Sequence, residues 1–428
     1  MKIVRVKILS AVLIISLFCA GSVFAADETY EKLKTMIDVM EIINVNYVSE
    51  TKSADLAVGA IKGVVRTLDP FSQYMEEKAY KDMKNETEGN YSGVGLRIME
   101  KNGFITVVSP IVGTPAFKAG VLPDDRIIKI DKKSAQGMST NEAVDLMRGK
   151  AGKKVKVIIR RDNVVEDLVF DLVREKIKIE TVRSTMLEEN IAYIRLSEFN
   201  AQSAADVKKE LSSLKKEGAQ AVILDLRNNP GGLLDSAIDI ISAFVKEKTL
   251  ALTTRGRVEG SEKKYYTHGV AEFADIPFII LVNRGSASAS EIVSGAFQDF
   301  KRALIIGQNT FGKGSVQTIF PLSDGTALRL TIAKYYLPSG RPINRSDDVN
   351  AKNGITPDIE IKVSIEDEIK LYTQADMVFA KDSEKKSDVK TDDKNKVEDE
   401  ALKKAIEIIK AGNVAAEIEK SAKQNSKK

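Results

Sequence analysis

The sequence predicts a multidomain α/β protein with a strand-helix core, a small β-rich domain and helical terminal segments. Between residues 175 and 365, apolar runs of strand length alternate with stretches of helical spacing. Between residues 88 and 174, short strands are separated by glycine-containing turns. At 428 residues, of which 43% are hydrophobic, the chain can bury two or three such cores.

The first 25 residues have the pattern of a secretory leader. Lys2, Arg5 and Lys7 precede an apolar run over 8–18, and small residues follow before Ala26. This run is shorter than the roughly 20 residues that span a bilayer, so we expect cleavage near Ala26. The expected location is therefore periplasmic or extracytoplasmic, with membrane association if the leader is retained.

The cysteine and charge content excludes several classes of function. Cys19 is the only cysteine and lies in the leader, so the mature chain would have no disulfide, catalytic thiol or Cys-based zinc site. Lipidation of Cys19 is a weaker alternative, because the bulky Phe18 precedes it. Without the three basic leader residues, the formal charge of +4 falls close to zero, which gives no reason to expect nucleic-acid binding.

The segment 26–87 is predicted to be helical. Apolar residues recur at helical spacing over 28–48 and again over 56–68, until Asp69 and Pro70 end the pattern. Two interpretations stay open for these helices: a cap on the core or a dimerisation arm.

The segments 88–174 and 175–365 are predicted to form separate domains. In the first, strands are expected near 94–100, 103–109, 125–133, 154–161 and 164–174, with one helix near 141–149. In the second, strands are expected at 191–199, 221–227 and 276–283, with helices over 205–218, after Gly232 and after Ser288. Two turns rich in glycine or serine thus follow buried strands, where open α/β folds commonly place their sites.

Within the tail, 366–428, a polar linker is expected at 380–397. A final helix then carries Leu402, Ile406 and Ile409 at helical spacing. It would dock on this chain or on another.

Ser288, within the sequence GSASASEI at 285–292, is the candidate nucleophile. It lies where a buried strand turns into a helix, whose N-terminus stabilises a developing negative charge. A Ser-His-Asp triad would have to use His268, the only histidine, which lies in a polar segment without a catalytic pattern. Ser286 and Ser290 compete locally, as a turn residue and a helix N-terminal residue.

Lys313, 25 residues after Ser288, is the candidate base. A lysine can take a serine proton only when its pKa falls from about 10.4 toward neutrality, which burial in an acid-free pocket achieves. The nearest carboxylates in sequence are Asp299 and Asp324. On an extended strand, Gln317 would point to the same side as Lys313 and orient its amine without adding charge.

The oxyanion of the reaction requires N–H donors, for which the sequence offers the amides of Ala289 and of Gly231 or Gly232. Glu291 is predicted to be a first-turn residue favoured by the helix dipole. For Arg341, a position in the substrate cleft and a structural salt bridge are equally expected.

Several stretches together resemble a known family. Residues 91–98 and 113–131 resemble a PDZ domain, with Gly93, Val94, Gly95 and Leu96 in the place of its carboxylate-binding loop. The stretches RNNPGGLL, NRGSASASEIVSGAFQD, TFGKGSVQ, YYLPSGRPIN and NGITPDI resemble the carboxyl-terminal processing proteases, the S41 family of serine peptidases.

The resemblance implies a Clp/crotonase-like α/β protease core with an inserted PDZ domain. It implies Ser288 as nucleophile, Lys313 as base and Gln317 as orienter, with no metal or organic cofactor. Protein substrates would be bound by their C-terminal ends, and the PDZ domain would act as gate and tether. The family also includes homodimers and proteases that work with a helical-repeat adaptor lipoprotein.

Two other function classes remain as alternatives. A catalytically silent peptide-binding scaffold would keep the PDZ domain but is expected to lose Ser288, Lys313 or Gln317, and all three are present. A small-molecule esterase or amidase would leave the PDZ domain without a purpose.

Overall fold

The computed structural model describes residues 28–425 except 89, 102, 112–113, 123–124, 162–163, 179, 344–353, 375–378 and 380–396. The predicted leader and nearly all of the predicted linker lie outside the described residues. The chain divides into two compact units, Met1–Glu76 with Thr318–Thr331, and Glu77–Gln317 with Ile332–Lys428. No helix within the described residues combines the length and the apolar character needed to cross a membrane.

The smaller unit is built on two helical segments and a short antiparallel pair. Residues 28–46 are helical, and α2 covers Ser53–Arg66, close to the predicted bounds. Asp69 accepts hydrogen bonds from two backbone N–H groups and a hydroxyl just after α2, which closes the turn at the predicted stop. β1 (Gln73–Met75) then pairs with the first part of β18 (Ala327–Tyr336).

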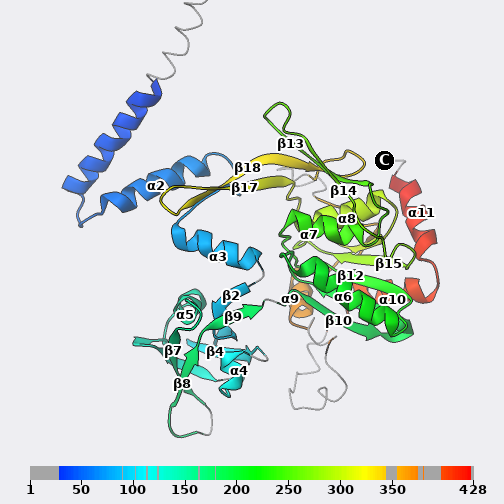
Figure 1. Ribbon diagram of the computed structural model, residues 1–428, viewed down its shortest axis with the longest axis horizontal. Coiled ribbons are helices and arrows are strands. Elements are labelled where there is room, and N and C mark those ends of the chain that lie inside the picture. Colours follow the sequence, from blue (N-terminus) through cyan, green and yellow to red (C-terminus); the bar gives the residue numbers. More distant parts are fainter. Residues whose placement is uncertain are drawn as a thin grey trace, which may run out of the picture. The chain divides into compact units, whose positions relative to one another are not determined.

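The β-rich domain lies within the larger unit and has its own core. Its sheet has the order β3-β4-β5-β7-β8, with β6 paired to β5, and α4 and α5 complete it (Figure 1). Strand β7, which lies between β5 and β8, alternates exposed and buried residues, as a strand with one face on a core must. The elements are β3 (Leu96–Lys101), β4 (Phe104–Pro110), α4 (Pro115–Lys118), β5 (Arg126–Ile130), β6 (Lys133–Ser134), α5 (Thr140–Met147), β7 (Lys154–Arg160) and β8 (Leu168–Val173).

A short helix and a two-stranded ladder flank this domain in the sequence. The helix α3 covers Glu77–Thr87. β2 (Asn90–Gly93) pairs antiparallel with β9 (Glu175–Lys178), so the chain enters and leaves the domain side by side.

The α/β core of the larger unit is a six-stranded sheet with the order β10-β11-β12-β15-β16-β19. All pairs are parallel except β10 with β11. The strands are β10 (Val182–Leu187), β11 (Ile191–Leu196), β12 (Ala221–Asp225), β15 (Phe278–Val282), β16 (Leu304–Gly307) and β19 (Ile359–Glu360), with the short helix η1 (Glu188–Asn190) between β10 and β11. The buried strands at 191, 221 and 276 are therefore confirmed.

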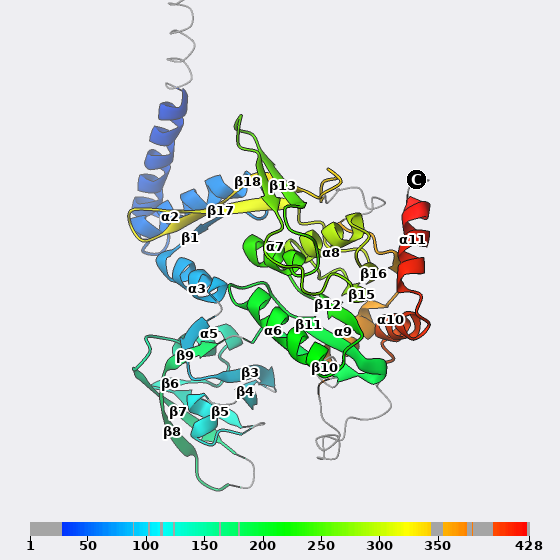
Figure 2. The same cartoon turned by 45° about the vertical axis from the view of Figure 1, so that its right-hand side comes forward.

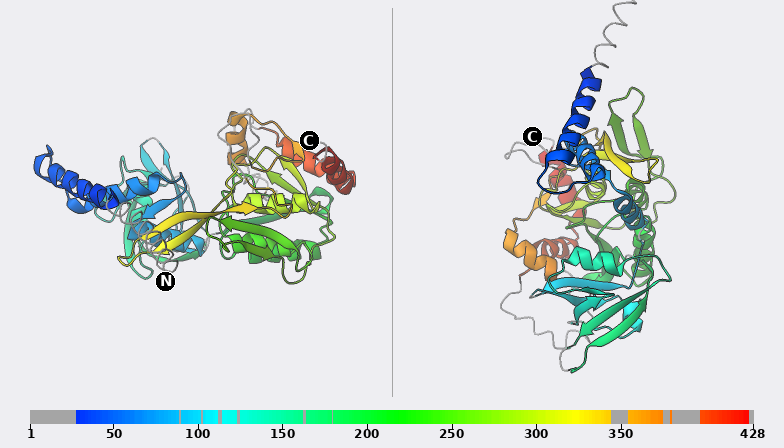
Figure 3. Two further views of the ribbon diagram at one scale, coloured as in Figure 1. Left: turned by 90° about the horizontal axis from the view of Figure 1, so that it is seen from above. Right: turned by 90° about the vertical axis from the view of Figure 1, so that its left-hand side faces the viewer.

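Helices cover both faces of this sheet. Because side chains alternate along a strand, Leu224 and Ile280 pack with α6, α7 and α8, whereas Ile223 and Ile279 pack with α10 and α11. Figures 2 and 3 show the two helical layers on opposite sides of the sheet. The helices are α6 (Ser203–Lys216), α7 (Leu234–Ser242), α8 (Ala289–Asp299), α9 (Ile365–Gln374), α10 (Glu400–Lys410) and α11 (Val414–Asn425).

A second sheet was not predicted from the sequence. β13 (Leu250–Gly256) pairs antiparallel with β14 (Lys263–Tyr266) and with the end of β18, while β17 (Ser315–Pro321) also pairs with β18. Its two hairpins, β13 with β14 and β17 with β18, come from separate parts of the sequence, and only the pairing of β13 with β18 identifies them as one sheet.

Helix α10, predicted as the final helix, docks on this chain with the predicted residues at the edge of the contact, and α11 follows it. Ala401, Ala405 and Ile408 are buried, whereas the predicted Leu402, Ile406 and Ile409 are only partly buried. Small alanine side chains allow the helix to approach the sheet closely, and the larger side chains then cover its margin.

Candidate active site

The turn between β15 and α8 places Ser288 at the N-terminus of α8. Ser288 has φ 52°, a conformation that a non-glycine residue adopts at a cost of about 1–3 kcal/mol. The neighbouring serines are fully buried and engaged: Ser286 Oγ donates to Leu226 O at 2.8 Å and Ser290 Oγ to Asn229 O at 3.0 Å. Ser288, with 7% of its surface exposed, is the serine of the three that solvent reaches.

The glycine turn after β12 packs directly against Ser288. A Cβ atom at Gly231 would lie 2.8 Å from Ser288 Cβ and 2.8 Å from the Ala289 nitrogen, so this approach requires glycine. Gly231 and Gly232 both have positive φ, at 98° and 141°. The Gly231 N–H donates to Asn229 Oδ1 at 2.9 Å, so this predicted oxyanion donor is already engaged.

Lys313 lies in the segment that leads into β17. β17 begins at Ser315, so Lys313 precedes the strand rather than lying on it. Gln317, within β17, has its amide Nε2 2.7 Å from Ser315 Oγ, to which it donates a hydrogen bond.

The prediction of an acid-free pocket concerned the Lys313 amine. The structure places a carboxylate at the main chain of the same residue. The Glu291 carboxylate accepts the Lys313 backbone N–H at 2.8 Å. Glu291 is remote in sequence from Lys313 but reaches it across the fold, which a search of sequence neighbours cannot reveal. Glu291 is also fully buried, unlike an ordinary first-turn glutamate.

Tyr335 lies near the Ser288 side chain and was not predicted from the sequence. Burial raises the pKa of Tyr335 to about 12, although a hydrogen bond with the Ser288 side chain opposes this rise. The backbone N–H of Tyr335 donates to Gly314 O at 2.9 Å, which ties β18 to the lysine segment. Two adjacent tyrosines in YYLPSGRPIN were the available signal, but nothing local shows which one faces Ser288.

The two remaining candidates lie at the surface of the larger unit. His268 Nε2 is 2.9 Å from Asp239 Oδ1, and 61% of the histidine side chain is exposed. Arg341 pairs with Asp299 at 2.9 Å and donates to Gln298 Oε1 at 2.7 Å, which favours the structural salt bridge over the cleft.

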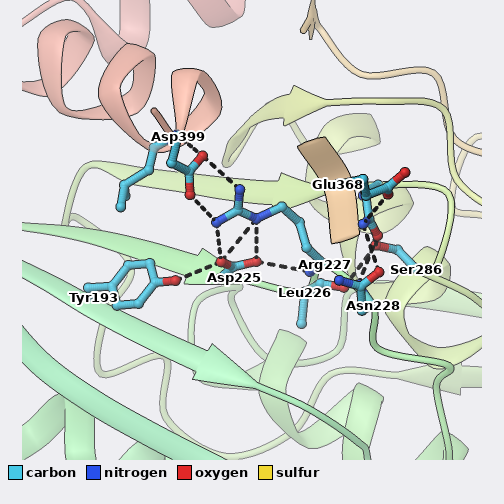
Figure 4. A network of polar contacts seen from close by, with 10 residues as sticks. Tyr193, Asp225, Leu226, Arg227, Asn228, Ser286, Glu368 and Asp399 are labelled. Atoms are coloured by element: carbon cyan, nitrogen blue, oxygen red, sulfur yellow. Dashed lines mark hydrogen bonds and ion pairs between the residues drawn. The ribbon is translucent and has the colours of Figure 1, made fainter. Parts of the chain in front are cut away.

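A buried ion network lies at the start of the glycine turn (Figure 4). Arg227 pairs with Asp225 at 2.6 Å and with Asp399, the N-cap of α10, at 2.8 Å. Tyr193 donates to Asp225 at 2.6 Å. Burial alone would raise the pKa of the Asp225 carboxyl, but Arg227 and the hydrogen bonds hold it below its usual range.

A second set of amide contacts joins the turn that precedes Ser288 to α9 (Figure 4). Asn283 Nδ2 donates to Asn228 Oδ1 at 2.9 Å and to Glu368 at 2.7 Å. Asn283 Oδ1 accepts from the N–H of Asn228 at 2.8 Å. The C-terminal segment therefore supports both turns of the site, through Asp399 and through Glu368.

The β-rich domain has a groove beside the predicted carboxylate-binding loop. Of the predicted loop residues, Val94, Gly95 and Leu96 line it, whereas Gly93 ends β2. Gly95 is required there, because a Cβ atom would collide with Thr114. The groove is also lined by Tyr91, Ile111, Val144, Met147, Arg148, Lys178 and Glu180.

Three parts of the chain match known families. Residues 190–361 match peptidase family S41, residues 106–161 match the PDZ domain, and residues 20–79 match the activating protease CtpB N-terminal domain.

Relatives of similar length exist. The carboxy-terminal-processing protease of Bartonella bacilliformis is 42% identical over 352 residues, covering 80% of this chain and 78% of the relative. Carboxy-terminal processing protease CtpA of Bacillus subtilis is 37% identical over 360 residues, covering 84% and 74%. Among solved structures, a photosystem II D1 C-terminal processing protease is 30% identical with a TM-score of 0.44, covering 76% of this chain and 86% of that one.

An α/β core of peptidase family S41, together with a PDZ domain, makes this chain a serine peptidase. Its sequence identity of 42% and 37% to relatives, over most of both chains, defines the group of serine peptidases more closely. The chain belongs to the carboxy-terminal processing proteases.

Proposed function

We propose that this chain is an exported endopeptidase that cleaves proteins near their C-terminus through a dyad of Ser288 and Lys313. The observation that carries this proposal is the position of Ser288 at the N-terminus of α8, against a glycine turn and joined through Glu291 to the main chain of Lys313. Gln317 acts as the uncharged orienter of the lysine amine.

In this mechanism the Lys313 amine takes the proton of the Ser288 hydroxyl as Oγ attacks the scissile carbonyl. The lysine then gives that proton to the leaving amine, and the C–N bond breaks to leave an acyl ester on Ser288. A water molecule, deprotonated by Lys313, attacks the ester; the C–O bond to Ser288 breaks, Lys313 returns the proton to Ser288 Oγ, and the new carboxylate is released.

The oxyanion is assigned to the backbone N–H groups of Ala289 and Gly232. The Ala289 nitrogen lies at the first turn of α8, where the helix dipole favours negative charge. Gly232 is preferred to Gly231 because the Gly231 N–H donates to Asn229.

The test uses a peptidyl diphenyl phosphonate, which phosphonylates an activated serine with loss of phenol. We expect stoichiometric labelling of Ser288, found by peptide mapping, and a parallel loss of cleavage of an unstructured protein. Labelling of another residue, or full cleavage after complete labelling of Ser288, would contradict the assignment.

The PDZ groove is proposed to bind the C-terminal end of the substrate as tether and gate. Its walls combine apolar residues, including Val144 and Met147, with the cations Arg148 and Lys178. An apolar terminal side chain can enter such a groove while the loop and cations meet its carboxylate.

Peptides with a free carboxylate are expected to bind at least about tenfold more tightly than the same peptides with a C-terminal amide, because the amide removes the charge. Isothermal titration calorimetry on the full chain measures this ratio. Val144→Asp should abolish binding, whereas Val169→Asp, at an exposed position on β8, should not. Equal affinity for acid and amide would exclude carboxylate recognition.

Homodimer formation through the N-terminal helices is also proposed. Tyr30, Leu33 and Ile37 share one face of the helix over 28–46 and have between 51% and 66% of their surface exposed, an unusually apolar face for a solvated helix. Export by the leader and cooperation with an adaptor lipoprotein complete the proposal.

A further inference from the structure

Glu291 is a buried charged residue that transfers no proton and forms no covalent bond in the dyad mechanism. It lies in the first turn of α8, three residues after Ser288, and none of its surface is exposed. Burial of a carboxylate is costly unless hydrogen bonds compensate it, so its partners show what the residue is for.

The Glu291 carboxylate accepts four hydrogen bonds, from the Ser288 turn and from the segment 310–313. Oε2 accepts the backbone N–H of Ser288 at 2.9 Å and that of Lys313 at 2.8 Å. Oε1 accepts the N–H of Gly312 at 2.7 Å and the hydroxyl of Thr310 at 2.5 Å. One carboxylate therefore joins the turn of the nucleophile to the segment of the base.

All four partners act as donors, which is the pattern that an ionised carboxylate satisfies. The Thr310 hydroxyl already accepts the Ile355 N–H at 2.7 Å, so its own hydrogen is directed to Glu291. Burial raises the pKa of Glu291, and the four hydrogen bonds oppose that rise.

The contact with Ser288 has a further consequence for the backbone. Ser288 adopts φ 52°, which the surrounding structure must hold in place. The hydrogen bond from the Ser288 N–H to Glu291 Oε2 fixes this conformation. The other three hydrogen bonds to the Glu291 carboxylate fix the segment 310–313.

We propose that Glu291 is a positioning residue that holds the Ser288 turn and the Lys313 segment together, and so sets the separation of the nucleophile and its base. This inference rests on the proposed dyad. It assigns to Glu291 a role in the rate of acylation and not in substrate binding.

Glu291→Gln preserves the shape and tests the role. In either orientation the amide nitrogen faces two N–H or O–H donors, so about half of the bridge is lost. Because a displacement of about 1 Å costs roughly 100-fold in rate, we expect kcat and the phosphonylation rate of Ser288 to fall about 100-fold, with KM changed less than about threefold. Glu291→Asp should retain more activity than Glu291→Gln.

The matched control is Ser294→Ala. Ser294 is a buried residue of the same helix whose hydroxyl meets only backbone carbonyls of α8, Ser290 O at 2.8 Å and Glu291 O at 3.5 Å, and not the Glu291 carboxylate. It should lower the melting temperature without lowering the phosphonylation rate per folded molecule. If folded Glu291→Gln protein reacted at the wild-type rate, the positioning role would be overturned.

Thr310 supplies a second test if Glu291→Gln fails to fold. Thr310→Val removes the hydroxyl that meets Oε1 and should slow phosphonylation about tenfold, whereas Thr310→Ser should restore it. Equal rates for Val and Ser would contradict the bridge. Failure of the dyad itself is distinguishable, because wild-type protein would then not be labelled at Ser288.

Discussion

Replacing either Ser288 or Lys313 with alanine is expected to lower the rate of proteolysis by at least about 10⁴-fold, because members of a catalytic unit act together. Ser288→Ala removes the atom that would carry the acyl group. Lys313→Ala leaves the serine hydroxyl without a base. The measurement is kcat/KM for a fluorogenic peptide with a free C-terminus, at equal concentrations of folded protein.

Matched substitutions separate catalysis from folding in this experiment. Lys301→Ala removes an exposed lysine at the end of α8 and should leave activity unchanged. Ser286→Ala removes a buried hydroxyl that donates to Leu226 O, so it should reduce stability more than turnover. Undiminished cleavage by Ser288→Ala or Lys313→Ala would refute the dyad.

The same assay gives a pH dependence with a defined sign. A lysine base must be uncharged to accept the Ser288 proton, so activity should rise with pH and be low in acid. An optimum near pH 5 would contradict a lysine base.

Arg227→Met is expected to lower the free energy of unfolding by about 3–5 kcal/mol, because it leaves two carboxylates without their cation. Asp225 is 3% exposed and Asp399 is 24% exposed, so solvent replaces little of the lost interaction. Chemical denaturation measures this change in free energy. Because α10 would also lose its contact with Arg227, we expect the glycine turn to become less rigid and kcat to fall.

Two comparisons make this prediction specific to the buried network. Asp399→Asn should cost less than Arg227→Met, because Asp225 still pairs with Arg227. Arg160→Met breaks a pair with Asp167 at the surface and should leave the unfolding midpoint nearly unchanged. A midpoint shift for Arg227→Met no larger than for Arg160→Met would show that the network adds no net stability.

The network also has a pH signature. The pKa of Asp225 is held below its usual range, so its contribution to stability is complete above the ordinary aspartate pKa of about 4. It is lost only as the pH falls further, through the lowered pKa of the folded state.

The sequence predicted the strands, helices and turns around the site better than the contacts between side chains within it. An apolar run followed by small residues and then by helical spacing could be recognised at 276–300, so Ser288 was located at its turn. The two glycines after β12 were recognised in the same way. Such patterns are local, because they arise from the periods of strands and helices.

Glu291 and Tyr335 could not be assigned in that way. A glutamate in the first turn of a helix usually faces solvent, and only its burial beneath the lysine segment shows another role. Tyr335 meets Ser288 because β18 returns beside the lysine segment, and adjacent tyrosines cannot be distinguished by composition.

The sequence by itself determined the α/β core, the β-rich domain, the serine turn and the family, because these follow from periodicity and from motifs a few residues long. The tertiary structure alone decided which distant groups meet: Asp399 reaches Arg227 across 172 residues, and the Glu291 carboxylate joins the Ser288 turn to the Lys313 segment. Such pairings depend on how the chain closes its loops and buries its charges, and neither is encoded in any single stretch of residues.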